Sequence, residues 1–314
     1  MLTIIRKYLP DWVYEYMADT PSEILDSMTE IRFRSGQPVI FTSNNIEYGI
    51  DETGLIKGPK WLIKARKADS NDIHKIVELV SNFSLYAWQE ELRNGFITIP
   101  GGHRVGLCGK AVVEGGKIKT LSHISSINFR IKHQVTGCSR EVFKYISLDK
   151  MGSILIISPP GGGKTTLLRD MARTLSNGDG SGNGLNIGIV DERSEIAGCF
   201  MGIPQNDVGI RTDVIDRCPK AEGMLTLLRS MSPQVIAVDE IGGKEDIDAI
   251  EYIINSGVRL LCTVHGFGIE DVKNKPYLSE LIKRRVFSHY IVLEDKERPG
   301  SIRFIYDESF IRVK

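Results

Sequence analysis

The segment Ser158–Thr165, SPPGGGKT, restricts the fold of this chain more than any other feature. It follows the apolar run Ile154–Ile157 and precedes the helix-like run Thr166–Ala172. A strand, a glycine-rich turn and a helix in this order are typical of a phosphate-binding loop. Glycines let backbone N–H groups close around phosphate oxygens, and the helix N-terminus adds positive potential. The sequence therefore predicts a nucleotide site behind a buried strand.

Each polar group of this loop has an expected task. Lys164 should reach the β- and γ-phosphates, and the Thr165 hydroxyl should bind Mg²⁺. Ser158 stands where the first glycine of such loops is usual, and its small side chain suits that position. A glycine-rich turn without a ligand is the alternative, and Gly-Lys-Thr after a buried strand argues against it. The residues expected to hold the nucleotide are Pro160, Gly161, Gly162, Gly163, Lys164, Thr165 and Thr166.

Two further strand ends carry candidate catalytic groups. Asp239 and Glu240 follow the apolar run Val235–Val238, as a Walker B segment does. We expect Asp239 to hold the Mg²⁺ shell and Glu240 to orient and deprotonate the attacking water. Paired carboxylates also begin ordinary solvated loops, but the phosphate-binding loop upstream favours the catalytic interpretation. His265 ends a later strand and could contact the γ-phosphate, although a lone histidine there is often structural.

The pattern of apolar runs indicates two domains. Residues 1–136 read as a smaller α+β domain, and residues 137–314 as an α/β domain with a mostly parallel sheet, each strand being followed by a helix. A strand between the phosphate-loop strand and the Asp239 strand, with Glu240 after Asp239, indicates a RecA-like P-loop ATPase domain. No Asn/Thr-Lys-x-Asp run that would read guanine is present, so ATP is expected. The strands expected in the second domain are 153–157, 186–190, 235–238, 259–264 and 289–293.

The first domain is predicted in less detail. Apolar residues between Ile4 and Met17 recur at helical spacing, and we expect them to pack on their own domain rather than on a membrane. Thr20, Pro21 and Glu23 predict a capped helix start, and Asp69 or Ser70 should cap a second helix. The strands expected here are 31–34, 39–41, 96–99, 104–113, 117–121 and 127–131.

Composition limits the remaining function classes. The chain has 40 basic and 40 acidic residues, so a strongly basic nucleic-acid binder is not expected. No apolar run approaches the roughly 18 residues of a membrane-spanning helix, and the 5 cysteines are expected to be free thiols. Two alternatives stay open: a RecA-like ATPase that depends on nucleic acid, and a nucleotide-gated scaffold that does not hydrolyse ATP.

Several motifs in a fixed order resemble the secretion-ATPase superfamily of type II and type IV secretion and of pilus retraction, and in particular its sporulation branch in endospore-forming Firmicutes. The acidic box, the LRSMSP segment and the histidine box are the specific ones. The resembling segments are 103–109, 126–131, the phosphate-binding loop, 191–196, 211–214, 228–233, 238–242 and 263–266.

This resemblance implies a ring, expected to be a hexamer, with ATP held between the two domains. It implies that Arg104 and Arg130 approach the γ-phosphate, with Arg193 and Arg211 as weaker candidates. It also implies an acidic box near the metal and the water, in which Glu195 is the main candidate; the other members are Asp191 and Glu192. The biology implied is a cytoplasmic motor, docked on membrane-embedded channel proteins, that energises a channel from mother cell to forespore.

Overall fold

The chain divides into two compact units, residues 1–133 and 134–314. The sequence predicts the division at residue 136. The side chain of Gln134 already belongs to the second unit, because its amide donates to the Asp207 carbonyl oxygen and its Oε1 accepts from the Asp207 N–H. The computed structural model describes residues 2–18, 20–58, 61–82, 88, 95–147, 151–178 and 183–314.

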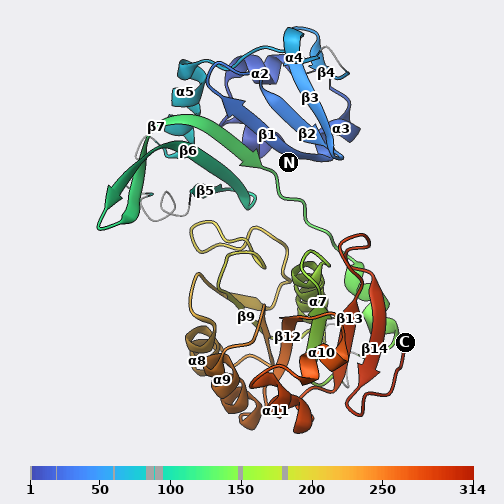
Figure 1. Ribbon diagram of the computed structural model, residues 1–314. Helices are drawn as coiled ribbons and strands as arrows, with labels where there is room; N and C mark the ends of the chain where they lie inside the picture. The colour runs from blue at the N-terminus through green and yellow to red at the C-terminus, as the bar shows by residue number, and fades with distance from the viewer. Residues whose placement is uncertain are drawn as a thin grey trace. The chain divides into compact units, whose positions relative to one another are not determined.

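An antiparallel sheet forms the frame of the N-terminal unit. Its described strands follow the order β4-β3-β2-β1-β7-β6-β5 (Figure 1). Alternation along β1, β6 and β7 places one side-chain face in the core and leaves the other face polar. The strands are β1 (Met28–Arg34), β2 (Ile40–Ser43), β3 (Ile46–Asp51), β4 (Gly54–Ile56), β5 (Phe96–Ile99), β6 (His103–Glu114) and β7 (Lys117–Arg130).

Short helices cover the apolar face of this sheet. Ile5, Val13 and Met17 are buried in its core, which confirms that the N-terminal apolar residues pack on their own unit. Asp69 caps the longest helix and forms a capping box with Asp72, as predicted. The helices are α1 (Leu2–Arg6), α2 (Asp11–Tyr16), α3 (Ser22–Asp26), α4 (Trp61–Lys64) and α5 (Ser70–Val80).

Two local predictions for this unit are wrong. Helix α3 begins one residue later than predicted, with Pro21 at the N-cap position, so the Thr20 hydroxyl is too far away to cap it and is buried without a partner. The predicted segments 117–121 and 127–131 are joined in a single strand, β7, which ends at Arg130, because β6 pairs along it through two register shifts. Gly109 lies at one of these bulges, where an added Cβ would stand 2.6 Å from the Ser122 carbonyl oxygen.

A second sheet forms the frame of the C-terminal unit. Its order is β10-β9-β11-β12-β8-β13-β14, and all neighbouring strands are parallel except the β13–β14 pair. The strands are β8 (Ile154–Ser158), β9 (Ile187–Asp191), β10 (Thr212–Asp216), β11 (Val235–Val238), β12 (Arg259–His265), β13 (His289–Leu293) and β14 (Ile302–Asp307).

Helices cover both faces of this sheet. Along β8, Ile154 and Ile156 face the core under α7, whereas Leu155 and Ile157 face the core under α8, α9 and α11. The helical segments are η2 (Cys138–Lys144), α7 (Lys164–Asn177), α8 (Lys220–Met231), α9 (Lys244–Asn255), α10 (Ile269–Lys273) and α11 (Leu278–Lys283). Among the described residues, no helix is both long and apolar enough to cross a membrane.

The expectation that every strand of this unit precedes a helix is wrong at two places. β9 leads through a loop into β10, and β13 turns back into β14. β10 and β14 are not predicted from the sequence, because both are edge strands with largely half-exposed residues and neither shows the continuous apolar run of a central strand.

A buried carboxylate attaches the start of this unit to α7. Asp170 accepts hydrogen bonds from the backbone N–H groups of Gly137 and Ser139 at 2.9 and 2.7 Å, and it pairs with Arg173 at 2.8 Å. Burial raises the pKa of Asp170, but these hydrogen bonds outweigh it and lower the pKa from 3.8 to about 2. The ionised carboxylate therefore stabilises the fold.

We expect Asp170→Asn to destabilise the C-terminal unit by about 1–3 kcal/mol at neutral pH, since two buried N–H groups lose an ionised acceptor. Because the folded pKa is depressed, this contribution is complete above about pH 4 and is lost as the pH falls towards 2. Denaturant unfolding followed by circular dichroism at pH 7 and pH 3 measures it. Tryptophan fluorescence is the internal control, because Trp12, Trp61 and Trp88 all belong to the N-terminal unit. Equal unfolding midpoints for both proteins at pH 7 would contradict the prediction.

Candidate functional site

The phosphate-binding loop connects β8 to α7, and two of its glycines, Gly162 and Gly163, have no room for a side chain. A Cβ on Gly162 would stand 2.4 Å from Ser158 Oγ, and a Cβ on Gly163 would stand 2.7 Å from the Gly300 nitrogen. Gly163 also has φ +92°, in the left-handed region that favours glycine. The Gly300 N–H donates to the Gly162 carbonyl at 2.8 Å, so the β13–β14 turn supports the loop from one side. The tight packing explains the glycines without reference to a ligand.

Lys164 and Glu240 form an ion pair at the centre of the site. Lys164 begins α7 with a nearly buried side chain, and its Nζ lies 2.7 Å from Glu240 Oε1. His265 Nε2 lies 2.8 Å from the same oxygen, and Arg193 Nη1 lies 3.2 Å from Oε2. The three partners come from α7, the end of β12 and the loop after β9. Parallel strands bring these positions to one edge of the sheet.

Charge controls the protonation of Glu240. Partial burial raises the pKa of its carboxyl group, but the hydrogen bond and charge of Lys164, together with His265 and Arg193, outweigh burial and hold the pKa below its usual value. Glu240 is therefore an ionised carboxylate near neutral pH. Its backbone has φ +58°, which is strained for a residue with a side chain. Such strain is common where a loop must place a reactive group.

Thr165 and Asp239 bring together the oxygen ligands that Mg²⁺ prefers. The Thr165 hydroxyl donates to Asp239 Oδ2 at 2.6 Å, and the Thr263 hydroxyl donates to Asp239 Oδ1. Thr263 also accepts the Glu240 N–H at 2.9 Å. A hydroxyl and a carboxylate beside a phosphate-binding loop fit the usual Mg²⁺ arrangement, in which substrate phosphates and waters complete the shell. Thr263, hidden within an apolar strand, was not singled out from the sequence.

The acidic box lies in the same pocket as the paired carboxylates. Asp191 is buried and accepts the backbone N–H groups of Glu195 and Ala197, each at 2.8 Å. Asp191 therefore shapes the loop, whereas the Glu195 side chain is exposed. The pocket is lined by Asp191, Glu192, Arg193, Glu195, Asp239 and Glu240.

Two arginines of the second unit donate to backbone carbonyl oxygens. Arg169 in α7 is buried and donates to the carbonyl oxygens of Glu195 and Ile196, so it ties the phosphate-loop helix to the acidic box. This role of Arg169 cannot be predicted from the sequence, because an arginine within a helix has no local signature. Arg211, a weaker candidate, donates to the Ser176 carbonyl near the end of α7, away from the phosphate-binding loop.

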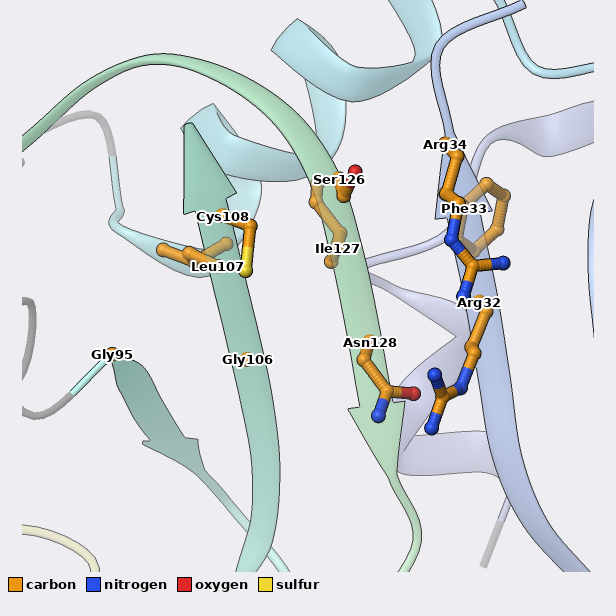
Figure 2. A pocket seen from close by; sticks show the side chains of 10 residues that line it. All are labelled: Arg32, Phe33, Arg34, Gly95, Gly106, Leu107, Cys108, Ser126, Ile127 and Asn128. Carbon is orange, nitrogen blue, oxygen red and sulfur yellow. The ribbon is translucent and has the colours of Figure 1, made fainter. Parts of the chain in front are cut away.

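Arg104 and Arg130 are opposite each other on β6 and β7 of the N-terminal unit, and the Arg104 guanidinium lies over the Phe96 ring. The same strands and β1 surround a hollow on the sheet (Figure 2). Arg32 and Asn128 project beside it from neighbouring strands, and Arg32 pairs with Glu30 at 2.8 Å. The N-terminal unit thus gathers several guanidinium groups around one part of its sheet.

The fold of this chain is similar to that of two solved bacterial proteins. The solved ATPase DotB of Legionella pneumophila is similar with a TM-score of 0.53 and 16% identity, covering 85% of this chain and 72% of DotB. The pilus retraction motor PilT, solved with bound ADP, has a TM-score of 0.54 and 16% identity, covering 86% of this chain and 75% of PilT. The fold therefore defines the class, that of the ATPase DotB and the pilus retraction motor PilT.

Within this class, the chain belongs to the family described as Sporulation stage III, protein AA, whose profile matches residues 7–313. Stage III sporulation protein AA of Bacillus subtilis (strain 168) is 40% identical over 304 residues, 97% of this chain and 94% of that protein. Protein SEEDLING PLASTID DEVELOPMENT 1 of Arabidopsis thaliana is 33% identical over 175 residues, 52% of this chain and 25% of its own length. The resemblance inferred from the motifs is confirmed.

Proposed function

We propose that this chain is an ATP-hydrolysing motor of the secretion type, with a RecA-like ATPase domain, that acts in sporulation. The observation that carries the proposal is the arrangement at one sheet edge: Lys164 on Glu240, and Thr165 on Asp239. Each pair joins a phosphate-loop residue to a carboxylate at the end of β11, which only β12 separates from the phosphate-loop strand β8. This arrangement suits ATP hydrolysis better than nucleotide binding alone, because it includes an ionised base as well as the phosphate cradle.

The ion pair suggests how ATP enters the reaction. Lys164 exchanges the Glu240 carboxylate for phosphate oxygens, which frees Glu240 to accept a proton from a water molecule. That water attacks the γ-phosphorus, the bond to the ADP oxygen breaks, and phosphate and ADP remain. Thr165 and Asp239 would hold Mg²⁺, which neutralises phosphate charge when bound. His265 and Arg193 are placed to hold Glu240 or to contact the γ-phosphate.

The finer assignments extend the proposal beyond the site. Arg104 and Arg130 are proposed to neutralise charge on the γ-phosphate, and Glu195 to act near the metal and water. The working assembly is proposed to be a hexameric ring in the cytoplasm. It would dock on membrane-embedded sporulation proteins and energise the assembly of a channel or transport through it. Family membership and the secretion-ATPase fold support these assignments.

The test is ATP hydrolysis per chain across a range of protein concentrations, with size measured in parallel. We expect specific activity to rise with concentration and to level off as a ring forms, because a ring completes each site with groups from a second chain. A constant rate from a monomer would contradict the ring and keep the ATPase. No hydrolysis at any concentration, with Mg²⁺ present, would contradict the ATPase itself.

A further inference from the structure

Lys220 occupies an unfavourable position for a lysine. It is the first residue of α8, where the helix dipole is positive and an acidic residue is preferred. Its side chain is also only 15% exposed, although lysine is among the residues least often buried. A residue that breaks local preferences in this way marks a place where tertiary contacts or function outweigh them.

The contacts of Lys220 explain why a cation is held there. Its Nζ donates to the Glu240 carbonyl oxygen at 2.9 Å. It also lies 3.3 Å from Glu192 Oε2 and 3.9 Å from Asp246 Oδ2. Glu192 belongs to the loop after β9, Glu240 follows β11, and Asp246 lies in the first turn of α9. One ammonium group therefore joins three chain segments around the candidate site.

Asp246 extends this connection through the turn that follows Glu240. Its Oδ2 accepts the N–H groups of Gly242 and Gly243 at 3.1 and 3.2 Å. The backbone from residue 240 to 243 is thus held by Lys220 at its carbonyl and by Asp246 at its N–H groups. The left-handed conformation of Glu240, φ +58°, lies within this stretch and needs such support.

We infer that Lys220 is a positioning residue for Glu240: it holds the strained backbone that aims the carboxylate and ties it to the acidic box. The inference rests on the proposed function, in which Glu240 is the base. The Glu240 side chain is held by Lys164, His265 and Arg193. When Lys164 turns to phosphate, Glu240 loses its closest side-chain partner, and the backbone contact with Lys220 carries more of the orientation.

Two substitutions at this position test the inference. Lys220→Met keeps the length of the side chain and removes the ammonium group, whereas Lys220→Arg keeps the charge. Misplacing a reactive group by about 1 Å costs on the order of 100-fold in rate, so we expect Lys220→Met to lower kcat by about 10–100-fold. Lys220 does not contact the phosphate-binding loop, so the Kd for ADP should change less than about threefold, which is under 1 kcal/mol. Lys220→Arg should recover most of the lost kcat.

Lys244→Met is the matched control. Lys244 is also the first residue of a 12-residue helix, α9, close to the same turn, but its side chain is exposed. We expect this variant to keep the kcat and ADP affinity of the unchanged protein. An effect of general helix weakening would appear in both variants, whereas a positioning effect would appear only at Lys220.

Each outcome has a defined meaning. Unchanged kcat in Lys220→Met would overturn the inference while leaving the ATPase proposal intact. The inference would also be overturned if Lys220→Met lost kcat and ADP affinity equally and Lys220→Arg recovered neither, because this result indicates a purely structural role. If the unchanged protein itself fails to hydrolyse ATP, the proposed function is wrong. ADP affinity and hydrogen exchange at residues 240–243 then test only the contact of Lys220 with the backbone. Unchanged exchange in Lys220→Met would overturn the inference.

Discussion

Lys164→Ala is expected to reduce ATP hydrolysis by at least about 100-fold, the usual cost of removing a charged group that stabilises a transition state. Lys164 is nearly buried and pairs with Glu240, and in the proposed mechanism it exchanges this carboxylate for phosphate oxygens. Without it, the phosphates lose their closest expected cation. The pKa of Glu240 should also rise, since burial then acts on its carboxyl group without its strongest opposing partner. Steady-state phosphate release at saturating Mg²⁺ and ATP measures the effect.

Lys144→Ala is the control for this prediction. Lys144 pairs with Glu141 on an exposed surface, so its removal should leave turnover unchanged. Circular dichroism establishes that both variants are folded. If folded Lys164→Ala hydrolyses ATP at the normal rate, the phosphate-binding loop does not bind the reacting phosphates and the proposed function is wrong.

Glu240→Gln is expected to separate ATP binding from hydrolysis. The amide keeps the shape of the side chain but cannot accept a proton from water, so turnover should fall by about 100–10,000-fold, the range for a lost general base. The neutral amide also competes less with phosphate for Lys164, which the carboxylate holds at 2.7 Å. ATP affinity should therefore stay equal or increase. A fluorescent ATP analogue measures binding, and single-turnover hydrolysis measures the chemical step.

Glu245→Gln is the matched control, because Glu245 is an exposed residue of the nearby helix α9. It should leave both binding and hydrolysis unchanged. Turnover at the normal rate in Glu240→Gln would remove Glu240 from the role of base and direct attention to Glu195 in the same pocket. Weakened ATP binding would show instead that Glu240 supports the loop rather than competing for Lys164.

The parts of the site that could be predicted from the sequence are contiguous segments. Gly163 has φ +92°, a left-handed conformation that favours glycine, and Asp239 and Glu240 follow a fully buried strand. Such features depend on backbone sterics and on the period of apolar residues, which neighbouring residues determine. Continuous apolar runs predict the central strands. The edge strands β10 and β14 are not predicted, because their polar residues interrupt such a run.

The order of the strands was decided only by the tertiary structure. Lys164 and Glu240 are separated by 76 positions in the chain. They meet because β8 and β11 are parallel strands with only β12, which carries His265, between them. Lys220, Arg169 and Thr263 acquire their contacts in the same way, from segments far apart in the chain.

The sequence by itself therefore determined that this chain has a phosphate-binding loop, a pair of candidate catalytic carboxylates and membership of a sporulation family. The tertiary structure decided which charges meet, which backbone is strained and which lysine supports it. The physical reason is that steric restrictions act between residues a few positions apart. Ion pairs depend instead on which strands become neighbours when the whole sheet packs.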